Sequence, residues 1–432
     1  MRFSTRFLRA SVVALAFCAC GRSDARLFAN IAEYTAQNAP VRGAARSFEP
    51  KAGRDVLMTV GVTLDKQRLA RIANTFIDRM EAAMSAFPAN DGGARQGVTK
   101  EAKQFIPAFL NDPFADAPAD VRAFADEVGL RNVKAGWAVL SIGNMEFQFT
   151  NGRPEPKYIP EMAVAVAADI DLEKVVAYAR RKFAEDKTND ATITDVQIAG
   201  ERAWQIVPTT EEAKKKAAQI KLDPCFTSLD GQLVLIASTK AALEKQIQLY
   251  RRGVDEGNLL REFKPGNGDL VCLGVKEFGA FVKKCLPDPE QQMMPLKSAI
   301  PNGDKIFFGL GDVTVNLSSK PDGNVSFSLK VIAASAEDAD ALRSLMKTFV
   351  MVGAAQLNQN PNVPKQFVSN IQRWKIEGTG PVIEASHDDV LTMAAGIATL
   401  SLQDDDAAEP VRAKPNPNRI STSEKDSIPS NK

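Results

Sequence analysis

His387, Asp388 and Asp389 are consecutive and include the single histidine of the 432-residue chain. A histidine beside a carboxylate can act as a general base when a serine or cysteine nucleophile lies within reach. The spacing favours another role, because Ser386-x-x-Asp389 is typical of a helix start with Asp389 near its positive end. Adjacent helical residues also point in different directions, so Asp388 is poorly placed to orient the imidazole. We therefore expect a capping or surface role rather than catalysis.

Other charged and aromatic residues have similarly plain interpretations. Asp169 and Asp171 have the spacing of helix N-caps, which suits them better than acid–base chemistry on a substrate. The charged run at 211–216 indicates a solvated helix, with a lysine contact to phosphate or a lipid headgroup as the alternative. Three tryptophans lie on expected strands, where they would fill the core or, alternatively, line a ligand site: Trp137, Trp204 and Trp374.

Three cysteines lie in the body of the chain: Cys225, Cys272 and Cys285. They allow at most one disulfide, so the chain is not a disulfide scaffold, and whether two of them pair stays open. Cys272 lies within a strand-like segment and Cys285 lies on an apolar helical stripe. Both are expected to be core residues rather than reactive thiols.

Composition and motifs assign no chemistry. Lys+Arg 54 against Asp+Glu 53 leaves a net charge of +1, which gives no indication of nucleic-acid binding. The P-loop, nucleophile-elbow, zincin and paired C-x-x-C motifs are missing from the sequence. We therefore expect a protein that is not an enzyme, with no catalytic, cofactor-binding or metal-ligating residues and no cofactor.

The N-terminus predicts export. Arg2, Arg6 and Arg9 precede a short apolar run, which is typical of a secretory signal peptide over residues 1–19. The segment Phe17-Cys18-Ala19-Cys20 resembles a bacterial lipobox, in which the cysteine thiol receives a diacylglycerol and becomes the new N-terminus. We predict lipidation at Cys20. Ordinary signal cleavage, after Cys18 or Ala25, is the alternative.

Two polar segments flank the body. Residues 20–54 are expected to be a tether or linker. Residues 403–432 contain four prolines and no aromatic residue, and such a segment buries too little apolar surface to offset the entropy of ordering. We predict a disordered tail there. The irregular segment 88–118 is expected to pack on its own domain, with a partner contact as the alternative.

Between these ends, hydrophobic periodicity switches between two and 3.6 residues. In the first part it predicts strands at 56–62, 162–168, 193–198, 203–207 and 232–237, with helices through Leu69, Val175 and Ile247. In the second part it predicts strands at 270–275 and 325–331, a strand pair within 305–317, and a final pair at 371–376 and 382–385. Helices are expected around Phe278, after a capping box at Ser335, and through Leu391.

The order of these elements indicates a duplication. Residues 233–239 and 380–387 both form an expected strand that ends in Ala-Ser and leads into a helix, and Val60-Gly61-Val62 matches Leu273-Gly274-Val275. We predict an α+β fold of two related units, 55–265 and 266–402. Each unit would have a mainly antiparallel sheet with helices packed on one face.

Three features together resemble an uncharacterised family of secreted bacterial lipoproteins built from duplicated α+β units: the lipid-acceptor pattern at Cys20, the strand–helix segment 231–245 and the alternating strand 325–331. The resemblance covers residues 55–400 as a pattern of elements. It implies an envelope location and nothing about a substrate. The signal segment and the lipobox-like run predict secretion across the inner membrane and a lipid anchor, on the periplasmic face or at the outer membrane. The resemblance carries over no functional residues.

These observations lead to a functional hypothesis with two alternatives. The leading one is a non-catalytic cell-envelope lipoprotein, membrane-anchored through Cys20, whose body binds a protein or envelope lipid component and no nucleic acid. The first alternative is a periplasmic carrier of a small apolar ligand, and the second is an enzyme whose site has no local motif. The identity of the partner, the oligomeric state and the membrane that holds the anchor stay open.

Overall fold

The structure is a computed structural model of the whole chain. It describes residues 56–397 apart from 87–111, 113, 116, 131–134, 144, 151–152, 168–169, 186–189, 232, 253–262, 265–266, 295–296, 298–300 and 360–362. The predicted signal peptide, lipidation site, tether and tail lie outside the described residues. Nearly all of the segment 88–118 lies outside them as well.

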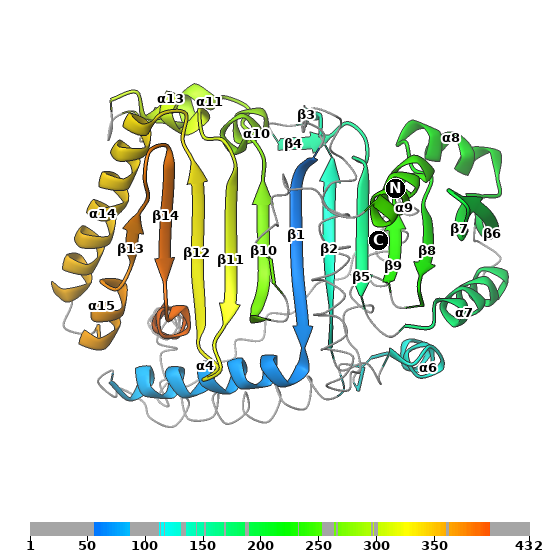
Figure 1. Cartoon of the computed structure of the whole chain (residues 1–432), viewed down its shortest axis with the longest axis horizontal. Coiled ribbons are helices and arrows are strands. Elements are labelled where there is room, and N and C mark those ends of the chain that lie inside the picture. Colours follow the sequence, from blue (N-terminus) through cyan, green and yellow to red (C-terminus); the bar gives the residue numbers. More distant parts are fainter. Residues whose placement is uncertain are drawn as a thin grey trace, which may run out of the picture.

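One antiparallel sheet of twelve strands forms the frame of the molecule, and helices lie around its edges and faces (Figure 1). The strand order is β13-β14-β12-β11-β10-β1-β2-β5-β9-β8-β7-β6, and a separate hairpin pairs β3 with β4. An α+β fold was predicted, and this is confirmed. The strands are β1 (Val56–Asp65), β2 (Ala135–Gly143), β3 (Phe147–Thr150), β4 (Arg153–Pro156), β5 (Met162–Ala167), β6 (Ala191–Ile198), β7 (Glu201–Pro208), β8 (Cys225–Leu229), β9 (Leu233–Ala237), β10 (Asp269–Val275), β11 (Val313–Ser319), β12 (Val325–Ile332), β13 (Lys375–Glu377) and β14 (Val382–His387).

The helices connect these strands. They are α4 (Lys66–Ala86), α6 (Ala119–Glu127), α7 (Leu172–Glu185), α8 (Glu211–Gln219), α9 (Lys240–Arg252), α10 (Phe278–Cys285), α11 (Pro289–Gln292), α13 (Gly303–Phe308), α14 (Ala336–Gln359), α15 (Lys365–Ile371) and a helix at 390–397. Among the described residues, none of these helices is long and apolar enough to cross a bilayer.

The sheet is continuous across the boundary between the two predicted units. β1 and β10 are neighbouring antiparallel strands at its centre, and Val60 lies directly opposite Leu273. On its other side β1 pairs with β2 along nearly its whole length. The two units therefore share one hydrogen-bonded sheet.

Helices cover both faces of the sheet at β5 and β9. Ala163 and Ala165 of β5 belong to the same core cluster as Leu243 and Ile247 of α9. Val164, which points to the opposite face, belongs to a second cluster with residues of α6 and α7. This differs from the expected packing on one face. The reason is that β5 is apolar at every position, MAVAVA, so neither of its faces suits water.

In the other half of the sheet, one face is apolar and the opposite face is polar. Val313, Val331 and Ile383 form a cluster with residues of α10, α13 and α14. The residues that alternate with them along β12 include Ser326 and Ser328, which point to the opposite face. This is the alternation expected for strands that are half-buried.

The predicted strand pair within 305–317 is wrong in its first part. Residues Gly303–Phe308 form helix α13, and only Val313–Ser319 form a strand. A short apolar run such as Ile306-Phe307-Phe308 fits a buried helix as well as a strand. Tertiary packing favours the helix here. Phe307 packs edge-on against Phe278 of α10, with ring centroids 6.0 Å apart. The two helices also approach closely, because a Cβ on Gly279 would lie 2.5 Å from the Phe307 carbonyl oxygen.

In the last predicted strand pair, the first strand is shorter than expected and the second, β14, continues two residues further. Residues Lys365–Ile371 form α15, and the strand β13 begins only at Lys375. The capping box at Ser335 is confirmed, because the Asp338 N–H donates to Ser335 Oγ at 3.1 Å. The predicted hairpin of β6 and β7 is confirmed as well, with Ala199 and Gly200 both at positive φ in its turn.

Helix α4 starts directly after β1 and runs beneath the other half of the sheet (Figure 1). Thr75 Oγ1 lies 3.5 Å from the carbonyl oxygen of Asp322, in the turn between β11 and β12. A Cβ on Gly323, which has φ +84°, would lie 3.1 Å from the Arg71 carbonyl oxygen. The far end of α4 thereby reaches α15 and the helix at 390–397.

Candidate functional site

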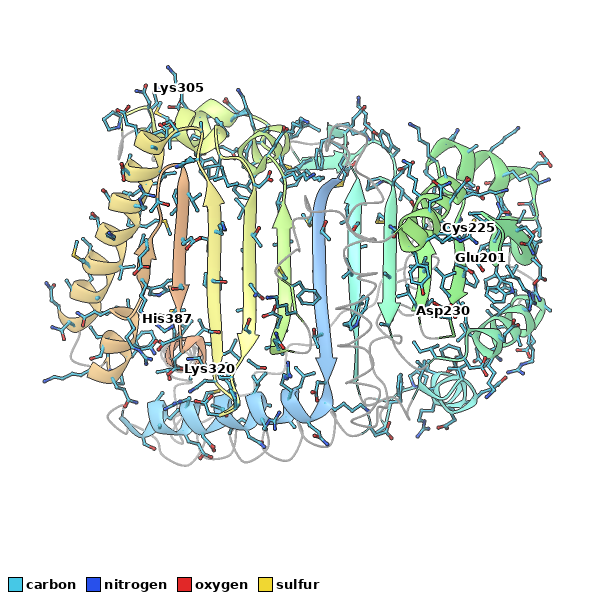
Figure 2. The ribbon with its side chains drawn as sticks, viewed as in Figure 1. Glu201, Cys225, Asp230, Lys305, Lys320 and His387 are labelled. Atoms are coloured by element: carbon cyan, nitrogen blue, oxygen red, sulfur yellow. The ribbon has the colours of Figure 1, made fainter. Side chains whose placement is uncertain are left out.

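The candidate site lies where four elements meet: α4, α15, the end of β14 and the helix at 390–397. In Figure 2, His387 at the end of β14 and Lys320 after β11 lie at the same end of the sheet. The sequence predicted a helix start at this point, with Ser386 as its first capping residue. The strand instead continues through His387, and the helix begins after Asp389.

His387 is 2% exposed, and both of its ring nitrogens are bound to the backbone. Nδ1 accepts the N–H of Asp389 at 3.1 Å, so Nε2 carries the hydrogen and donates to the Asn370 carbonyl oxygen at 2.8 Å. The ring also lies beside Trp374, with centroids 5.2 Å apart. These contacts give the imidazole a structural role, because neither nitrogen is left to take a proton from a nucleophile.

Asp389 is the N-cap of the helix at 390–397. Its Oδ1 accepts the N–H of Thr392 at 3.2 Å, and its Oδ2 accepts the Thr392 hydroxyl at 2.9 Å. The expected capping role is therefore confirmed for Asp389. The same carboxylate, 9% exposed, faces two guanidinium groups: Arg373 at 3.7 Å and Arg79 at 4.0 Å.

Asp388 anchors Arg373 from the other side. Arg373 Nη2 donates to Asp388 Oδ2 at 2.6 Å, and Lys320 Nζ donates to the Asp388 carbonyl oxygen at 2.8 Å. Partial burial raises the pKa of Asp388, but the hydrogen bond and charge of Arg373 and the charge of Lys320 outweigh it, so the pKa lies below its ordinary value. Asp388 is therefore ionised at neutral pH and holds the Arg373 side chain in place.

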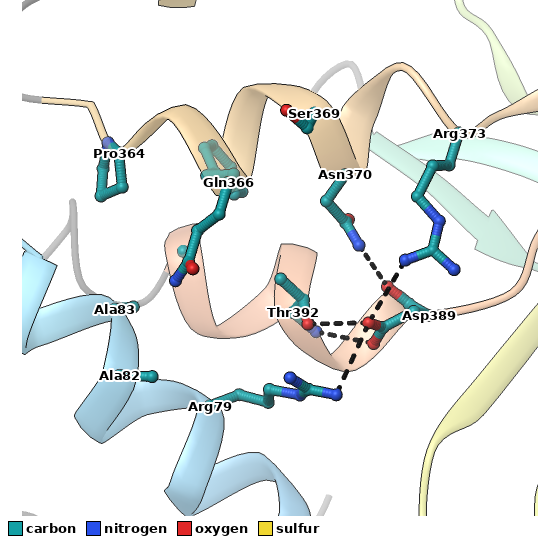
Figure 3. A pocket seen from close by; sticks show the side chains of 12 residues that line it. Arg79, Ala82, Ala83, Pro364, Gln366, Ser369, Asn370, Arg373, Asp389 and Thr392 are labelled. Atoms are coloured by element: carbon teal, nitrogen blue, oxygen red, sulfur yellow. Dashed lines mark hydrogen bonds and ion pairs between the residues drawn. The ribbon is translucent and has the colours of Figure 1, made fainter.

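A cavity of about 360 Å³ opens between α4, α15 and the helix at 390–397 (Figure 3). Arg79 and Arg373 reach into it from opposite sides, toward Asp389. Their side chains are 44% and 47% exposed. Arg79 forms no other ion pair or hydrogen bond within the described residues, and its contact with Asp389 is too long for a hydrogen bond. The other residues around the cavity are Ala82, Ala83, Pro364, Gln366, Phe367, Ser369, Asn370, Thr392 and Gly396.

This arrangement suits binding. A guanidinium presents five N–H donors, and Arg79 has nearly all of them available. A carboxylate or phosphate oxygen entering the cavity would meet Arg79, whose acidic neighbour, Asp389, also caps a helix, and Arg373, which Asp388 holds in place. Asn370 fixes the cavity wall between the two arginines, because its Nδ2 donates to the Asp389 carbonyl oxygen at 3.2 Å.

Comparisons with protein-family models, curated proteins and solved structures gave no match to this chain. The geometry of the chain itself is thus the basis for a function. Within the described residues, no group of three or more histidine, cysteine, aspartate or glutamate side chains is placed to hold a metal ion.

The remaining charged candidates from the sequence lie far from this cavity. Asp171 caps α7, where its Oδ1 accepts the Lys174 N–H at 3.2 Å, while Asp169 lies outside the described residues. The run at 211–216 forms the solvated helix α8, in which lysines pair with glutamates of the same helix, as in Lys214 with Glu211 at 2.8 Å. Both expected structural roles are confirmed.

The aromatic candidates divide into two groups. Trp137 and Trp204 are buried in the core, as expected, and within the described residues their Nε1 atoms have no hydrogen-bond partner. Trp374 is half-buried and lies just before β13, between Phe327 and His387. Phe114, from the end of the irregular segment 88–118, is 3% exposed and packs in the core with α6 and α7.

Cys225, Cys272 and Cys285 form no disulfide with one another in the described part of the chain. Burial raises the pKa of Cys225 to about 12, and the nearby charge of Asp223 adds to this. Burial also raises the pKa of Cys285. Cys272 on β10 is 1% exposed and belongs to the same core cluster as Phe263. The raised pKa makes the thiols of Cys225 and Cys285 poor nucleophiles at neutral pH. The expected core position is confirmed for Cys272, whereas Cys285 is half-buried.

Sequence reasoning missed Arg79, Asn370 and Arg373. Arg79 lies more than 300 positions before Asp389 in the sequence, on a helix whose pattern predicts only an apolar face. No local pattern indicates such a long-range meeting. Arg373 and Lys375 next to Trp374 are a weak signal, because two cations at alternate positions beside an aromatic residue suit a binding surface.

Proposed function

We propose that this protein is a non-catalytic binding protein of the bacterial cell envelope, held by a lipid on Cys20. Its ligand, a protein or another envelope component, would engage the cavity between α4, α15 and the helix at 390–397. Arg79 and Arg373 are the residues we propose as its main contacts.

The half-exposed Arg79 guanidinium is the observation that carries this proposal. It reaches into the cavity across from Arg373 and stays 4.0 Å from Asp389, with no closer acceptor in the described part of the chain. A surface arginine is ordinarily free to turn into solvent, and a cavity that directs two arginines toward one point favours an anionic group of a ligand. The backbone hydrogen bonds of His387 support a role without catalysis, because they occupy the one imidazole available as a base.

We also propose that 55–265 and 266–402 are duplicated units. The support is the strand order, which from the centre outward reads β1-β2-β5-β9-β8 in one direction and β10-β11-β12-β14-β13 in the other. Val60 and Leu273, which the sequence match aligns, are direct cross-strand partners, as expected at a local twofold axis. Superposing the two halves of an experimental structure on these strand pairs tests the relation.

A carrier of a small apolar ligand is the second candidate. The observation in its favour is a row of aliphatic residues across three central strands: Leu140, Val60 and Leu273 are direct neighbours and each is only half-buried. Exposed aliphatic surface of this kind suits an apolar ligand. The cavity at Asp389 favours a polar ligand instead, which is why the carrier is placed second.

Native mass spectrometry of the full-length protein, extracted gently from its own envelope, tests the proposal. We expect acyl mass on Cys20 and a second component that remains bound. The variant Arg79→Ala should lose that component. The matched control is Arg122→Ala, since Arg122 is an exposed arginine on α6 at the other end of the sheet.

Three outcomes would contradict the proposal. An unacylated monomer with nothing attached would rule out both the lipid anchor on Cys20 and the bound component. Equal loss of the component in Arg79→Ala and Arg122→Ala would show that the component does not bind at the assigned cavity. Retention of a neutral lipid by wild type and Arg79→Ala alike would favour the carrier.

A further inference from the structure

A second cavity, of about 220 Å³, lies on the polar face of the sheet and shares Arg373 with the first. Its floor is a row of side chains on four adjacent strands, which we name the polar row: Asn316, Ser328, Ser386 and Lys375. Each is the direct cross-strand partner of the next, from β11 through β12 and β14 to β13. Direct partners project to the same face, so the row forms one continuous surface.

The serines in the middle of the polar row have hydroxyl groups available for a ligand. Within the described residues, neither Ser328 nor Ser386 uses its hydroxyl in a hydrogen bond. The far end of the floor differs, because Asn316 Nδ2 and Ser318 Oγ both donate to the buried carboxylate of Asp269, at 3.1 Å and 2.5 Å. Polar groups at that end are thus committed to the fold, whereas those in the middle are not.

Two cations stand at the near end of the cavity. Lys375 is exposed and has no ion pair in the described part of the chain, and Arg373, two residues earlier, is held by Asp388 at 2.6 Å. With Asp388 ionised, the charged residues around this cavity sum to one net positive charge. The serines between the cations and Asn316 are small, so a ligand group can approach the sheet closely.

We propose that this second cavity binds a phosphate group, with Lys375 and Arg373 neutralising its charge and the hydroxyls of Ser328 and Ser386 donating to its oxygens. The inference rests on the proposed binding function and specifies the chemical class of the ligand. The donors come from the sheet floor, where Ser328, Ser386 and Lys375 lie, and from Arg373, which precedes β13 and also lines the cavity. A tetrahedral group with several oxygens can use them together, whereas a planar carboxylate has only two oxygens.

The phosphate could belong to a soluble phosphate compound or to a lipid headgroup. The full chain with Cys20→Ser, which has no acceptor thiol for an anchor, allows both sources to be tested. Its binding of inorganic phosphate and of acetate is measured by calorimetry at low ionic strength, because salt screens such contacts. Its binding to phosphatidylglycerol vesicles, with phosphatidylcholine vesicles for comparison, is measured by cosedimentation.

Phosphate is expected to bind about tenfold more tightly than acetate. Lys375→Gln should weaken phosphate binding about tenfold, and Ser386→Ala about fivefold, as expected for a charged and a neutral hydrogen bond. The matched control is Lys330→Gln, because Lys330 lies on the same face of the same sheet and pairs with Glu384 at 3.5 Å. It should leave the affinity within about twofold, as usual for an exposed pair.

Phosphate binding without binding to phosphatidylglycerol vesicles assigns the site to a soluble phosphate compound, and binding of both assigns it to a lipid headgroup. Acetate binding as tight as phosphate binding, or equal effects of Lys375→Gln and Lys330→Gln, overturns the inference. If native mass spectrometry still captures an envelope component in that case, the proposed function stands and only the phosphate assignment fails. If phosphate binds but no envelope component is captured, the phosphate assignment stands and the proposed envelope ligand fails.

Discussion

β5 and β9 have both faces buried, whereas β11 and β12 have one face covered by helices and the other lined by polar side chains. Along β5 every residue after Met162 is buried. Along β12 only Val325 and Val331 are buried, and the serines between them are more exposed. Both pairs of strands lie in the same sheet, on opposite sides of the central strands β1 and β10.

This difference shows that the two halves of the sheet are stabilised in different ways. At β5 and β9, apolar burial on both faces stabilises the fold, and that packing leaves no room for a ligand. Where β12 begins and β14 ends, helix caps, ion pairs and the backbone contacts of His387 fix the structure and leave two cavities open. We therefore expect apolar substitutions to matter most in the first region, and polar substitutions and pH to matter most in the second.

The largest effect is expected for Leu243→Ala in α9. Leu243 is fully buried against β5 and β9, and its truncation should lower the free energy of unfolding by about 3 kcal/mol. The matched variant Leu342→Ala, at a half-buried position of α14, should cost roughly 1 kcal/mol because less apolar area is lost. Urea unfolding followed by circular dichroism measures both. Equal losses would mean that the two regions are packed equally well.

His387→Leu should lower the free energy of unfolding by about 2 kcal/mol. Leucine fills much of the same space but leaves the Asn370 carbonyl and the Asp389 N–H without their buried partner. The same urea experiment measures the loss. A neutral or stabilising result would show that these two backbone groups find water in the cavities, and the second region would then be looser than described.

Asp389→Ala should cost about 1 kcal/mol, the usual effect of losing an N-cap. Asp389→Asn separates capping from charge, because asparagine caps equally well but cannot pair with Arg79 or Arg373. We expect Asp389→Asn to cost less than about 0.5 kcal/mol, since both ion pairs are long and both arginine side chains are half-exposed. Thermal unfolding at neutral pH compares the two variants. If they lose equal stability, the ion pairs rather than the cap hold this corner together.

The smallest effect is a pH dependence carried by Asp388. Its folded-state pKa is lowered, so the ionised carboxylate stabilises the fold above its ordinary value of 3.8, and this contribution is lost as the pH falls through the folded-state pKa. The melting temperature of Arg373→Gln should therefore lie below that of wild type at pH 7 and converge with it in acid. Melting curves between pH 2 and 7 measure this.

The control for the pH experiment is Arg122→Gln, an exposed arginine on α6 with no ion pair within the described residues. Its melting temperature should follow wild type at every pH. A gap between wild type and Arg373→Gln that persists in acid would show that Arg373 stabilises the fold through packing rather than through Asp388.

The sequence predicted the elements whose own periodicity is strong. β1, α4, β5, α7 and the β6–β7 hairpin all lie where the apolar spacing and turn residues indicate them. It was wrong at α13, where a short apolar run fits either structure and packing against α10 decides. It missed α15, whose buried Phe367 and Val368 are set by contacts with α14 and the helix at 390–397 rather than by local pattern.

The candidate site could be predicted only in part. Asp389 was expected at a helix start because that role depends on neighbouring residues, and so it can be read locally. The position of Arg79 beside Asp389 cannot be predicted from neighbouring residues, because it depends on the path that α4 takes beneath the sheet. The polar row has the same limitation: Ser328 and Ser386 become neighbours only through the register of β12 with β14.

The path of α4 has a consequence for the order in which the protein matures. A chain synthesised from its N-terminus completes α4 well before the turn at Asp322 and the helix at 390–397, the places where α4 docks. The apolar side of α4 therefore stays uncovered until almost the whole body has been made. For this reason, late truncations should be as harmful to the start of the chain as to its end.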